Sequence, residues 1–326
     1  SFAKQFNAPQ DITATTPTFT VERGQGTNTI AQRLYQEHFI NDPFIFMIAV
    51  TALGQHTNLK AGEYELTTGL SQRDIMQKMI DGDTFARRVT IREGLTSYEV
   101  VETLKDIDAL TGEITTPPAE GSLLPNTYDY QRDEDRNQII TRMQQNMQDT
   151  LQRLCALPIT DTKSPKWEKS FEQQSCGDGQ LLKTVNDVLT LASIIEKETA
   201  IPEERRRVAG VFINRLKRGM PLQTDPTVIY AITKGAHKND GQGPLGRRLL
   251  TKDLEYESPY NTYKYPGLPP GPIANTGIAS IEAALNPENH DFIFFVADGN
   301  GGHAFAQTLA EHNRNVAKWR KARAEK

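Results

Sequence analysis

The sequence lacks a long apolar run, a dense block of basic residues and an initial methionine. Its longest apolar stretch, Phe44 to Leu53 with one threonine inside, is about half of the roughly 20 residues that a membrane-spanning helix needs. The net charge is −4, whereas a general nucleic-acid binder usually has a basic face. We therefore expect a soluble chain with no nucleic-acid partner, and any signal or anchor segment to have been removed before Ser1.

Several catalytic and ligand-binding motifs are also missing. The six histidines form neither an HExxH pair nor a tight cluster, which leaves little support for zinc catalysis. The sequence contains no serine nucleophile elbow and no glycine-rich phosphate loop before a helix. The GNGG run at 299–302 is better interpreted as a hairpin turn than as a phosphate cradle. The sequence thus predicts no metal and no cofactor.

The sequence has only two cysteines, Cys155 and Cys176. Two are too few for a four-thiolate zinc site, and their spacing excludes a CxxC redox motif. They are either free thiols in a reducing compartment or one disulfide in an oxidising one. The segment between them is polar and interrupted by prolines, and closing it would restrict the unfolded chain by roughly 3 kcal/mol. We favour the disulfide, and with it a location outside the cytoplasm.

The 326 residues, 37% of them hydrophobic, can build the cores of two domains. The pattern of apolar residues predicts two domains of unequal size. Residues 1–20 have no apolar period and are expected to form a tether or an edge strand. Residues 21–86 are predicted to form a strand–helix–helix–strand–helix module, with one helix starting at Asp42-Pro43 and the last ending at Gly82. Residues 87–326 form a much larger domain, which includes the excursion between the cysteines.

The larger domain mixes helices with a few short strands. Strands are predicted at 87–91 and 292–297, the second followed by a turn and a returning strand. Helices are predicted mainly at four places: 137–154, 184–199, 202–218 and 311–323. The predicted fold class is therefore α+β, with a small module followed by a larger mixed α/β domain.

One predicted helix, 184–199, carries a chemically suggestive pattern. Its apolar residues cover one broad face, and Glu196 and Glu198 lie on the two flanks of that face. A carboxyl at the end of an apolar face can be desolvated, which raises its pKa and lets it act as a general acid near neutral pH. Periodicity alone favours an ordinary solvated flank, and it does not choose between the two glutamates.

Short polar motifs with prolines and aromatic rings follow this helix. They are LQTDPTVIY at 222–230, PYNTY at 259–263, GLPPGPI at 267–273 and NTGI at 275–278. Amide, hydroxyl and ring groups of this kind suit a sugar chain, which offers hydroxyls for hydrogen bonds and ring faces for stacking. Ordinary structural loops explain the same composition, and a rigid proline-rich groove could equally bind a peptide.

Taken in order, a series of motifs closely resembles the endolytic murein transglycosylases, the YceG-like family. The motifs are GSLLPNTYDY (121–130), LASIIEKET (191–199), VFINRL (211–216), GMPLQTDPTVIYA (219–231), SPYNTY (258–263), GLPPGPIANTG (267–277) and FVADGNGGHAF (295–305). The module at 21–86 is similar to the LysM-type module that this family carries, and 87–326 is then the YceG-like catalytic domain.

The resemblance implies a peptidoglycan lyase. Such an enzyme cuts the β-1,4 bond between N-acetylmuramic acid and N-acetylglucosamine within glycan strands and leaves 1,6-anhydro ends, which helps to terminate nascent strands or set their length. A single glutamate is expected to serve as acid and then as base. A hydrolase would normally need two carboxylates, whereas an intramolecular nucleophile relaxes that need. The alternatives are a non-catalytic peptidoglycan-binding scaffold and a muramidase-type hydrolase.

Matching the family's motif places the catalytic group at Glu198, the second glutamate of EKET, with Glu196 as the alternative. The resemblance also implies these substrate-binding candidates: Gln223, Thr224, Asp225, Asn261, Tyr263, Pro270, Asn275 and His303. Asp225 could equally cap the helix that follows it. Asn214 and Arg215 are expected to brace the helix pair rather than touch glycan.

The resemblance also implies a place and partners. The substrate is peptidoglycan glycan strands, and cell-wall synthases are further candidate partners. A single N-terminal membrane anchor is expected in the full-length protein, on the periplasmic side of the bacterial inner membrane. The cysteine pair fits that setting, where a disulfide can form.

Overall fold

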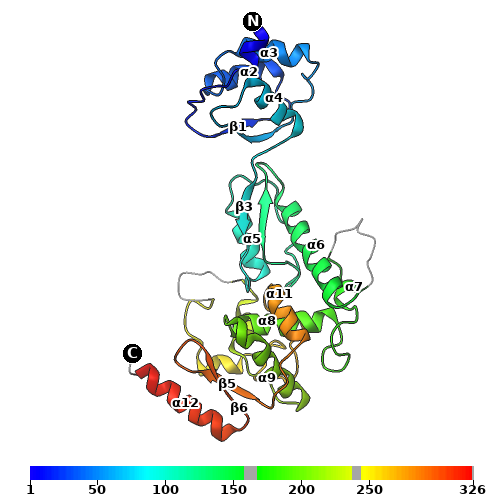
Figure 1. Ribbon diagram of the computed structural model, residues 1–326. Helices are drawn as coiled ribbons and strands as arrows, with labels where there is room; N and C mark the ends of the chain where they lie inside the picture. Colours follow the sequence, from blue (N-terminus) through cyan, green and yellow to red (C-terminus); the bar gives the residue numbers. More distant parts are fainter. Residues whose placement is uncertain (158–166, 237–243, 325–326) are drawn as a thin grey trace. The chain divides into compact units, whose positions relative to one another are not determined.

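The computed structural model describes residues 1–157, 167–236 and 244–324. They cluster into two compact units, which we call the first unit (1–89, 108–111 and 128–134) and the second unit (90–107, 112–127 and the described residues from 135 onward). Helices dominate, and the strands form small two-stranded sheets (Figure 1). The predicted α+β class is confirmed.

The first unit contains four helices and an antiparallel strand pair. In chain order its elements are α1 (Phe2–Phe6), β1 (Thr18–Val21), α2 (Thr27–Gln36), α3 (Pro43–Ala52), β2 (Gly62–Glu65) and α4 (Gln72–Asp81). The helix starts follow from the sequence: Asp42 accepts the N–H of Phe44 at 2.8 Å ahead of Pro43, and Ser71 begins α4 with a capping box. Gly82 ends α4 in the left-handed region, at φ +71°.

The core of the first unit lies between this strand pair and its helices. Phe19 of β1 pairs in register with Tyr64 of β2, and both side chains are fully buried. The Phe19 ring meets Phe39 edge-on at 5.5 Å between ring centroids. Phe6 of α1 joins the same core, so the stretch expected to be a tether or an edge strand contains the start of β1 and also a short helix that contributes a buried side chain.

A second strand pair is formed by β3 (Arg87–Thr90) and β4 (Thr127–Tyr130). The division between the two units falls within both strands, after Val89 and before Tyr128. Among the described residues no helix is both long and apolar enough to cross a membrane.

The second unit is built around one buried helix, α8 (Val185–Glu198). Its neighbours in the fold include α9 (Arg205–Lys217), α10 (Asp225–Thr233) and α11 (Ile278–Leu285). The remaining helices of this unit are α5 (Ser97–Lys105), α6 (Arg136–Leu154), α7 (Lys169–Glu172), α12 (Leu309–Ala324) and the short 3₁₀ helices at Pro202–Glu204 and Thr251–Glu255. α8 begins at Thr184 with a capping box and is buried along most of its length, which fixes where its last turn ends.

Cys155, which directly follows α6, forms a disulfide with Cys176. Part of the segment that the bond closes, 158–166, lies outside the described residues. The rest packs on the core of the second unit, where Phe171 is buried and meets Trp167 edge-on at 5.2 Å. The described part of the excursion thus packs on the main core, and the disulfide joins its two ends.

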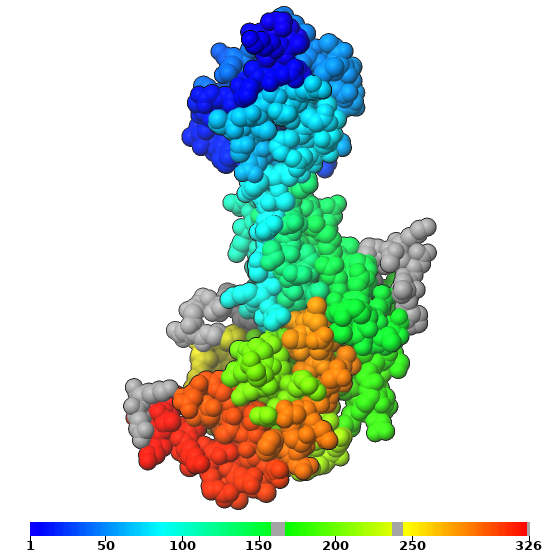
Figure 2. Space-filling view, in the orientation of Figure 1, coloured from blue at the N-terminus to red at the C-terminus, as the bar shows by residue number. Residues whose placement is uncertain are grey.

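The C-terminal part consists of a hairpin and a helix. β5 (Phe294–Ala297) and β6 (His303–Ala306) pair antiparallel, with Phe295 opposite Phe305. α12 packs along this hairpin (Figure 1), and none of its described residues is buried. Figure 2 shows the red atoms of α12 on the surface, beside the orange-red atoms of the hairpin.

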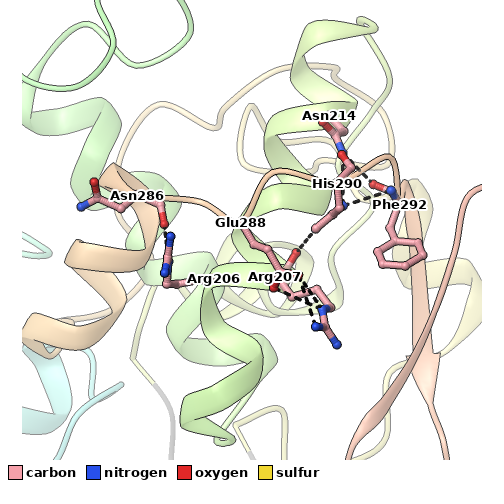
Figure 3. A network of polar contacts seen from close by, with 7 residues as sticks. All are labelled: Arg206, Arg207, Asn214, Asn286, Glu288, His290 and Phe292. Carbon is pink, nitrogen blue, oxygen red and sulfur yellow. Dashed lines mark hydrogen bonds and ion pairs between the residues drawn. The ribbon is translucent and has the colours of Figure 1, made fainter.

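The chain that enters β5 is fastened to α9 by polar contacts (Figure 3). Arg207 pairs with Glu288 at 3.2 Å, and the Asn214 side-chain amide donates to the carbonyls of His290 and Phe292 at 2.7 and 3.0 Å. Gly210 allows the close approach, because a Cβ there would lie 2.5 Å from the Glu288 carbonyl oxygen. This network fixes the position of β5 beside α9.

Candidate active site

A cavity of about 590 Å³ opens at the C-terminal end of α8. We call it the Glu198 cavity. Its walls come from α9, the turn before α10, the loop that carries Tyr263, strand β5 and the first turns of α12. Its polar lining includes Glu198, Arg215, Gln223, Asp225, Tyr263 and His312. Segments far apart in the sequence thus meet around one carboxyl group.

Glu198 is the last residue of α8 and is half-buried. Burial raises the pKa of its carboxyl to about 7, and the negative charge of Asp225 acts in the same direction. A contact with the Thr224 hydroxyl lowers the pKa and only partly opposes these effects. The C-terminal end of a helix also disfavours a negative charge. Near neutral pH the group can therefore both give and take a proton.

Asp225 and Tyr263 form a pair beside Glu198. The Tyr263 hydroxyl donates to Asp225 Oδ1 at 2.5 Å. Burial and this bond raise the pKa of Tyr263 well above its usual range, so the phenol stays protonated and keeps donating. Asp225 lies in the first turn of α10, where its negative charge suits the helix dipole. Its described hydrogen bond goes to Tyr263 rather than to the backbone of α10, whose N-cap is Thr224.

The turn before α10 is held in an unusual conformation. Gln223 has a φ of +53°, the left-handed region that residues other than glycine rarely adopt. Its N–H donates to the Thr262 carbonyl at 3.2 Å, and the N–H of Thr224 donates to the Thr262 hydroxyl at 3.1 Å. Backbone strain of this kind persists only where the surroundings hold it, and it is concentrated at functional sites.

Arg215 connects three walls of the cavity. Its Nε donates to the Ile293 carbonyl at 2.7 Å, and its Nη1 donates to the Pro221 carbonyl at 3.0 Å. The guanidinium lies 5.1 Å from the centre of the Phe294 ring. Burial lowers its pKa from the usual arginine value. Arg215 thus fixes the strained turn and β5 relative to α9, and it contributes positive charge to the cavity.

The model of the YceG-like family matches residues 19–318. This chain belongs to the YceG-like family. It is 34% identical to the endolytic murein transglycosylase of Bacillus subtilis, over 96% of this chain and 87% of that protein. It is 28% identical to the endolytic murein transglycosylase of Streptococcus pneumoniae strain D39, over 91% of this chain but only 57% of that protein. The crystal structure of a YceG-like protein from Listeria monocytogenes is 32% identical and matches with a TM-score of 0.50, covering 91% of this chain and 98% of that one.

In this YceG-like chain, five of the residues that the resemblance singled out lie together at the end of α8. Gln223, Asp225 and Tyr263 line the Glu198 cavity with Glu198 itself, and Thr224 is buried just behind them. The Thr224 hydroxyl has no hydrogen-bond partner of ordinary geometry among the described residues. These residues form the candidate active site.

Glu196 lies on the other flank of α8. Its carboxylate accepts the N–H of Gly277 at 3.1 Å, and Gly277 is the residue that caps α11. A Cβ at Gly277 would lie 1.8 Å from a carboxylate oxygen of Glu93, so this corner is closely packed. Glu196 is not among the residues that line the Glu198 cavity, and its contacts give it a structural role.

Asn261 and Asn275 are completely buried, and the hydrogen bonds of their side chains stay within the protein. Asn261 donates to the carbonyls of Leu254 and Tyr256, both at 2.8 Å, and accepts the N–H of Tyr263 at 3.0 Å. Asn261 therefore shapes the loop that presents Tyr263.

Asn275 has a similar structural environment elsewhere in the second unit. It accepts the N–H of Leu123 at 3.0 Å and donates to the Leu95 carbonyl and the Ser97 hydroxyl, both at 3.1 Å. These contacts join the segment of Asn275 to the segment of Leu123 and to the start of α5, and the side chain is buried away from solvent. They support a structural role rather than contact with glycan.

Pro270 and His303 also lie apart from the Glu198 cavity. Pro270 is exposed, and its carbonyl accepts from the side-chain amide of Asn186 at 3.0 Å. His303 pairs with Glu204, with 2.6 Å between its Nδ1 and Glu204 Oε2, and it lines a different cavity beside the turn of the β5–β6 hairpin. The motif residues therefore lie in the Glu198 cavity, in the loops that support it, or at positions away from both, such as the cavity beside the hairpin turn.

Sequence reasoning missed several residues of the cavity wall. Arg215 was expected to brace helices; it does hold the fold together, and it also lines the cavity. The sequence feature that could have indicated Arg215 as a cavity residue is that it is a single arginine in the otherwise largely apolar run VFINRL. The Phe294 ring stacks on His312 of α12 at 4.9 Å, and no local pattern in a basic terminal helix indicates that it reaches the site.

A second carboxyl with a raised pKa lies away from this site. Burial raises the pKa of Glu120 to about 7, although its carboxylate accepts from the Ser97 N–H at 2.8 Å and the Tyr230 hydroxyl at 3.2 Å. These contacts occupy both of its oxygens and connect loops. No group of three or more His, Cys, Asp or Glu is placed to hold a metal within the described ranges.

Proposed function

We propose that this chain is an endolytic murein transglycosylase, the activity for which its curated relatives are named. It cuts the β-1,4 bond between N-acetylmuramic acid and N-acetylglucosamine within peptidoglycan strands and leaves 1,6-anhydro ends. The observation that carries the proposal is Glu198, a carboxyl with a pKa of about 7 in an open cavity at the end of a buried helix. Such a group is suited to acid and base work at the same pH.

One carboxyl can serve both halves of this reaction. Protonated Glu198 gives its proton to the glycosidic oxygen as the bond to C1 of the muramic acid breaks. The resulting carboxylate then takes the proton of the C6 hydroxyl while that oxygen bonds to C1. No water is consumed, and Glu198 ends protonated, ready for the next cycle. Attack by the C6 hydroxyl of the same sugar is unimolecular and needs no second protein group to hold a nucleophile.

The neighbours of Glu198 support these steps. The negative charge of Asp225 helps to keep Glu198 protonated, and it favours the positive charge that develops at C1 in a glycosyl transition state. Tyr263 holds Asp225 in place through its hydroxyl. Gln223 and Arg215 supply amide and guanidinium groups to the walls, where a sugar chain offers hydroxyl and acetamido groups.

A muramidase-type hydrolase is the second candidate, because Asp225 is a second acidic side chain in the same cavity. Mass spectrometry of the products from purified sacculi separates the two reactions. A transglycosylase releases muropeptides with an anhydro end, which are one water lighter than the reducing ends that a hydrolase produces. Only reducing ends would contradict the proposal, and no release at all would favour a non-catalytic scaffold.

The module at residues 21–86 is proposed to bind glycan as a LysM-like domain. Its order of strand, two helices, strand and helix, with β1 paired to β2, supports that interpretation. Deleting residues 21–86 should weaken binding to insoluble peptidoglycan and leave the secondary structure of the second unit intact by circular dichroism. Unchanged binding would make the module a spacer.

The site of action is proposed to be the periplasmic side of the inner membrane, with an N-terminal anchor and cell-wall synthases as partners. The disulfide between Cys155 and Cys176 supports a place outside the cytoplasm, because disulfides persist in oxidising compartments. Thiol labelling of the protein as isolated from that compartment tests this point. Two free thiols there would contradict it.

A further inference from the structure

A second cavity, of about 320 Å³, lies between the turn of the β5–β6 hairpin and the second half of α12. We call it the turn cavity. Its lining includes Gly301, Gly302, His303, Trp319 and Arg323. It shares no lining residue with the Glu198 cavity.

The two cavities follow one another along the same two elements. On β5, Val296 lines the Glu198 cavity and the next residue, Ala297, lines the turn cavity. On α12, His312 lines the first and Trp319 lines the second. Seven helical residues correspond to about 10 Å along the axis. An extended chain molecule that follows α12 from the Glu198 cavity therefore reaches the turn cavity.

The groups in the turn cavity suit a sugar that carries an acid. Trp319 is only partly buried and offers an aromatic ring, against which the apolar face of a sugar can pack. The Arg323 guanidinium lies 5.5 Å from the centre of that ring and can pair with a carboxylate. His303 is fixed by Glu204, so its position does not depend on a ligand.

The close approach of backbone and helix at this place depends on glycine. Gly299 has a φ of +87°, and a Cβ there would lie 3.1 Å from the Cβ of Ala322 on α12. A Cβ at Gly302 would lie 3.0 Å from carboxylate oxygens of Asp298 and Glu204. The cavity is thus shaped by a turn that larger residues would push away from the helix.

The charge of α12 differs from that of the chain as a whole. The net charge of the chain is −4, but the described residues of α12 include one acidic residue, Glu311, and five basic ones. The basic residues are Arg314, Lys318, Arg320, Lys321 and Arg323. A local positive surface attracts anionic polymers. In peptidoglycan the anionic groups are the carboxylates of the peptide stems attached to the muramic acid residues.

We infer that the turn cavity is a second binding site for the glycan strand whose bond is cut at Glu198. It takes a sugar ring against Trp319 and the carboxylate of an attached peptide stem at Arg323. This inference rests on the proposed function. Its consequence is that strands long enough to occupy both cavities are cut in preference to short glycans that reach only the first.

The test compares kcat/KM for long uncrosslinked strands with kcat/KM for a synthetic glycan of two disaccharide units. In Trp319→Ala the long-to-short ratio should fall about tenfold, the size expected for losing one aromatic contact. Arg323→Gln should lower it about threefold, and Trp319→Phe should restore part of the loss. Arg153→Gln is the matched control, because it removes an exposed positive charge from α6 of the same unit and lines neither cavity.

An unchanged long-to-short ratio in both Trp319→Ala and Arg323→Gln would overturn the inference. An equal fall of kcat/KM for the long and the short substrate would also overturn it, because the helix would then only support the Glu198 cavity. If Trp319→Ala loses its folded circular dichroism spectrum, Arg323→Gln decides. Arg323-dependent binding to anionic lipid vesicles with an unchanged ratio would assign the surface to membranes instead. If the wild type releases no anhydro products from either substrate, the proposed function fails, which is a different result from an unchanged ratio.

Discussion

The two flanks of the last turn of α8 differ sharply, although their glutamates are only two positions apart. On one flank, Glu198 reaches a cavity where burial and the charge of Asp225 raise its pKa to about 7. On the other, Glu196 accepts the Gly277 N–H and helps to fix the start of α11. The comparison teaches that the helix sets the position of each carboxyl, whereas the neighbouring loops decide whether its pKa is raised or it accepts a backbone hydrogen bond.

The largest expected effect comes from Glu198→Gln. The amide keeps the shape of the side chain but cannot give or take the proton, so kcat should fall by about 10³-fold. Release of anhydromuropeptides from sacculi measures the rate, and circular dichroism checks that the fold is kept. Glu196→Gln is the matched control and should stay near wild-type activity. An inactive Glu196→Gln variant together with an active Glu198→Gln variant would contradict the assignment of Glu198.

A smaller effect, on pH dependence, is expected from Asp225→Asn. The negative charge of Asp225 raises the pKa of Glu198, so removing it lowers that pKa. Because the proposed first step needs protonated Glu198, we expect activity to be lost as pH rises through this pKa. The alkaline limb of the kcat/KM profile should therefore move to lower pH, by about one unit. The control Asp291→Asn removes an exposed carboxylate elsewhere and should leave the alkaline limb in place. An alkaline limb that moves to higher pH in Asp225→Asn would contradict the effect of Asp225 on the pKa of Glu198.

The smallest effect is expected from Glu196→Ala, and it should appear in stability rather than activity. The variant loses the acceptor for the Gly277 N–H, which costs about 1 kcal/mol. Part of that loss is offset. The pKa of Glu93 is raised mainly by burial and also by repulsion from the charge of Glu196, and the variant removes this repulsion. Thermal unfolding should show a Tm lower by a few degrees. An unchanged Tm together with lost activity would place Glu196 in the reaction.

The sequence predicted the elements of this fold better than their assembly. Caps, prolines and apolar spacing are local signals, and the helices around Asp42-Pro43 and Thr184 begin where those signals lie. The short helix at Phe2–Phe6 was missed, because five residues are too few to show a period and its buried Phe6 depends on packing.

The candidate site was predictable only in part, for a similar reason. Motif matching indicated Glu198, Asp225 and Tyr263, but periodicity could not separate Glu198 from Glu196. The difference arises from loops distant in sequence, since Asp225 and Gly277 belong to different segments that meet α8 on opposite flanks. The contributions of Arg215 and His312 depend on packing between distant elements, which no short pattern records.

The most direct test of the difference between the two flanks is a titration of the carboxyl of Glu198. Carbon-13 NMR of glutamate labelled at Cδ can follow the wild type and Glu198→Gln side by side. Glu120→Gln identifies the signal of a second described carboxyl whose pKa is raised to about 7. We predict that Glu198→Gln removes a signal that titrates near pH 7. If the signal that it removes titrates near the ordinary value of about 4.3 instead, Glu198 is not held ready as a proton donor and the proposed chemistry is contradicted.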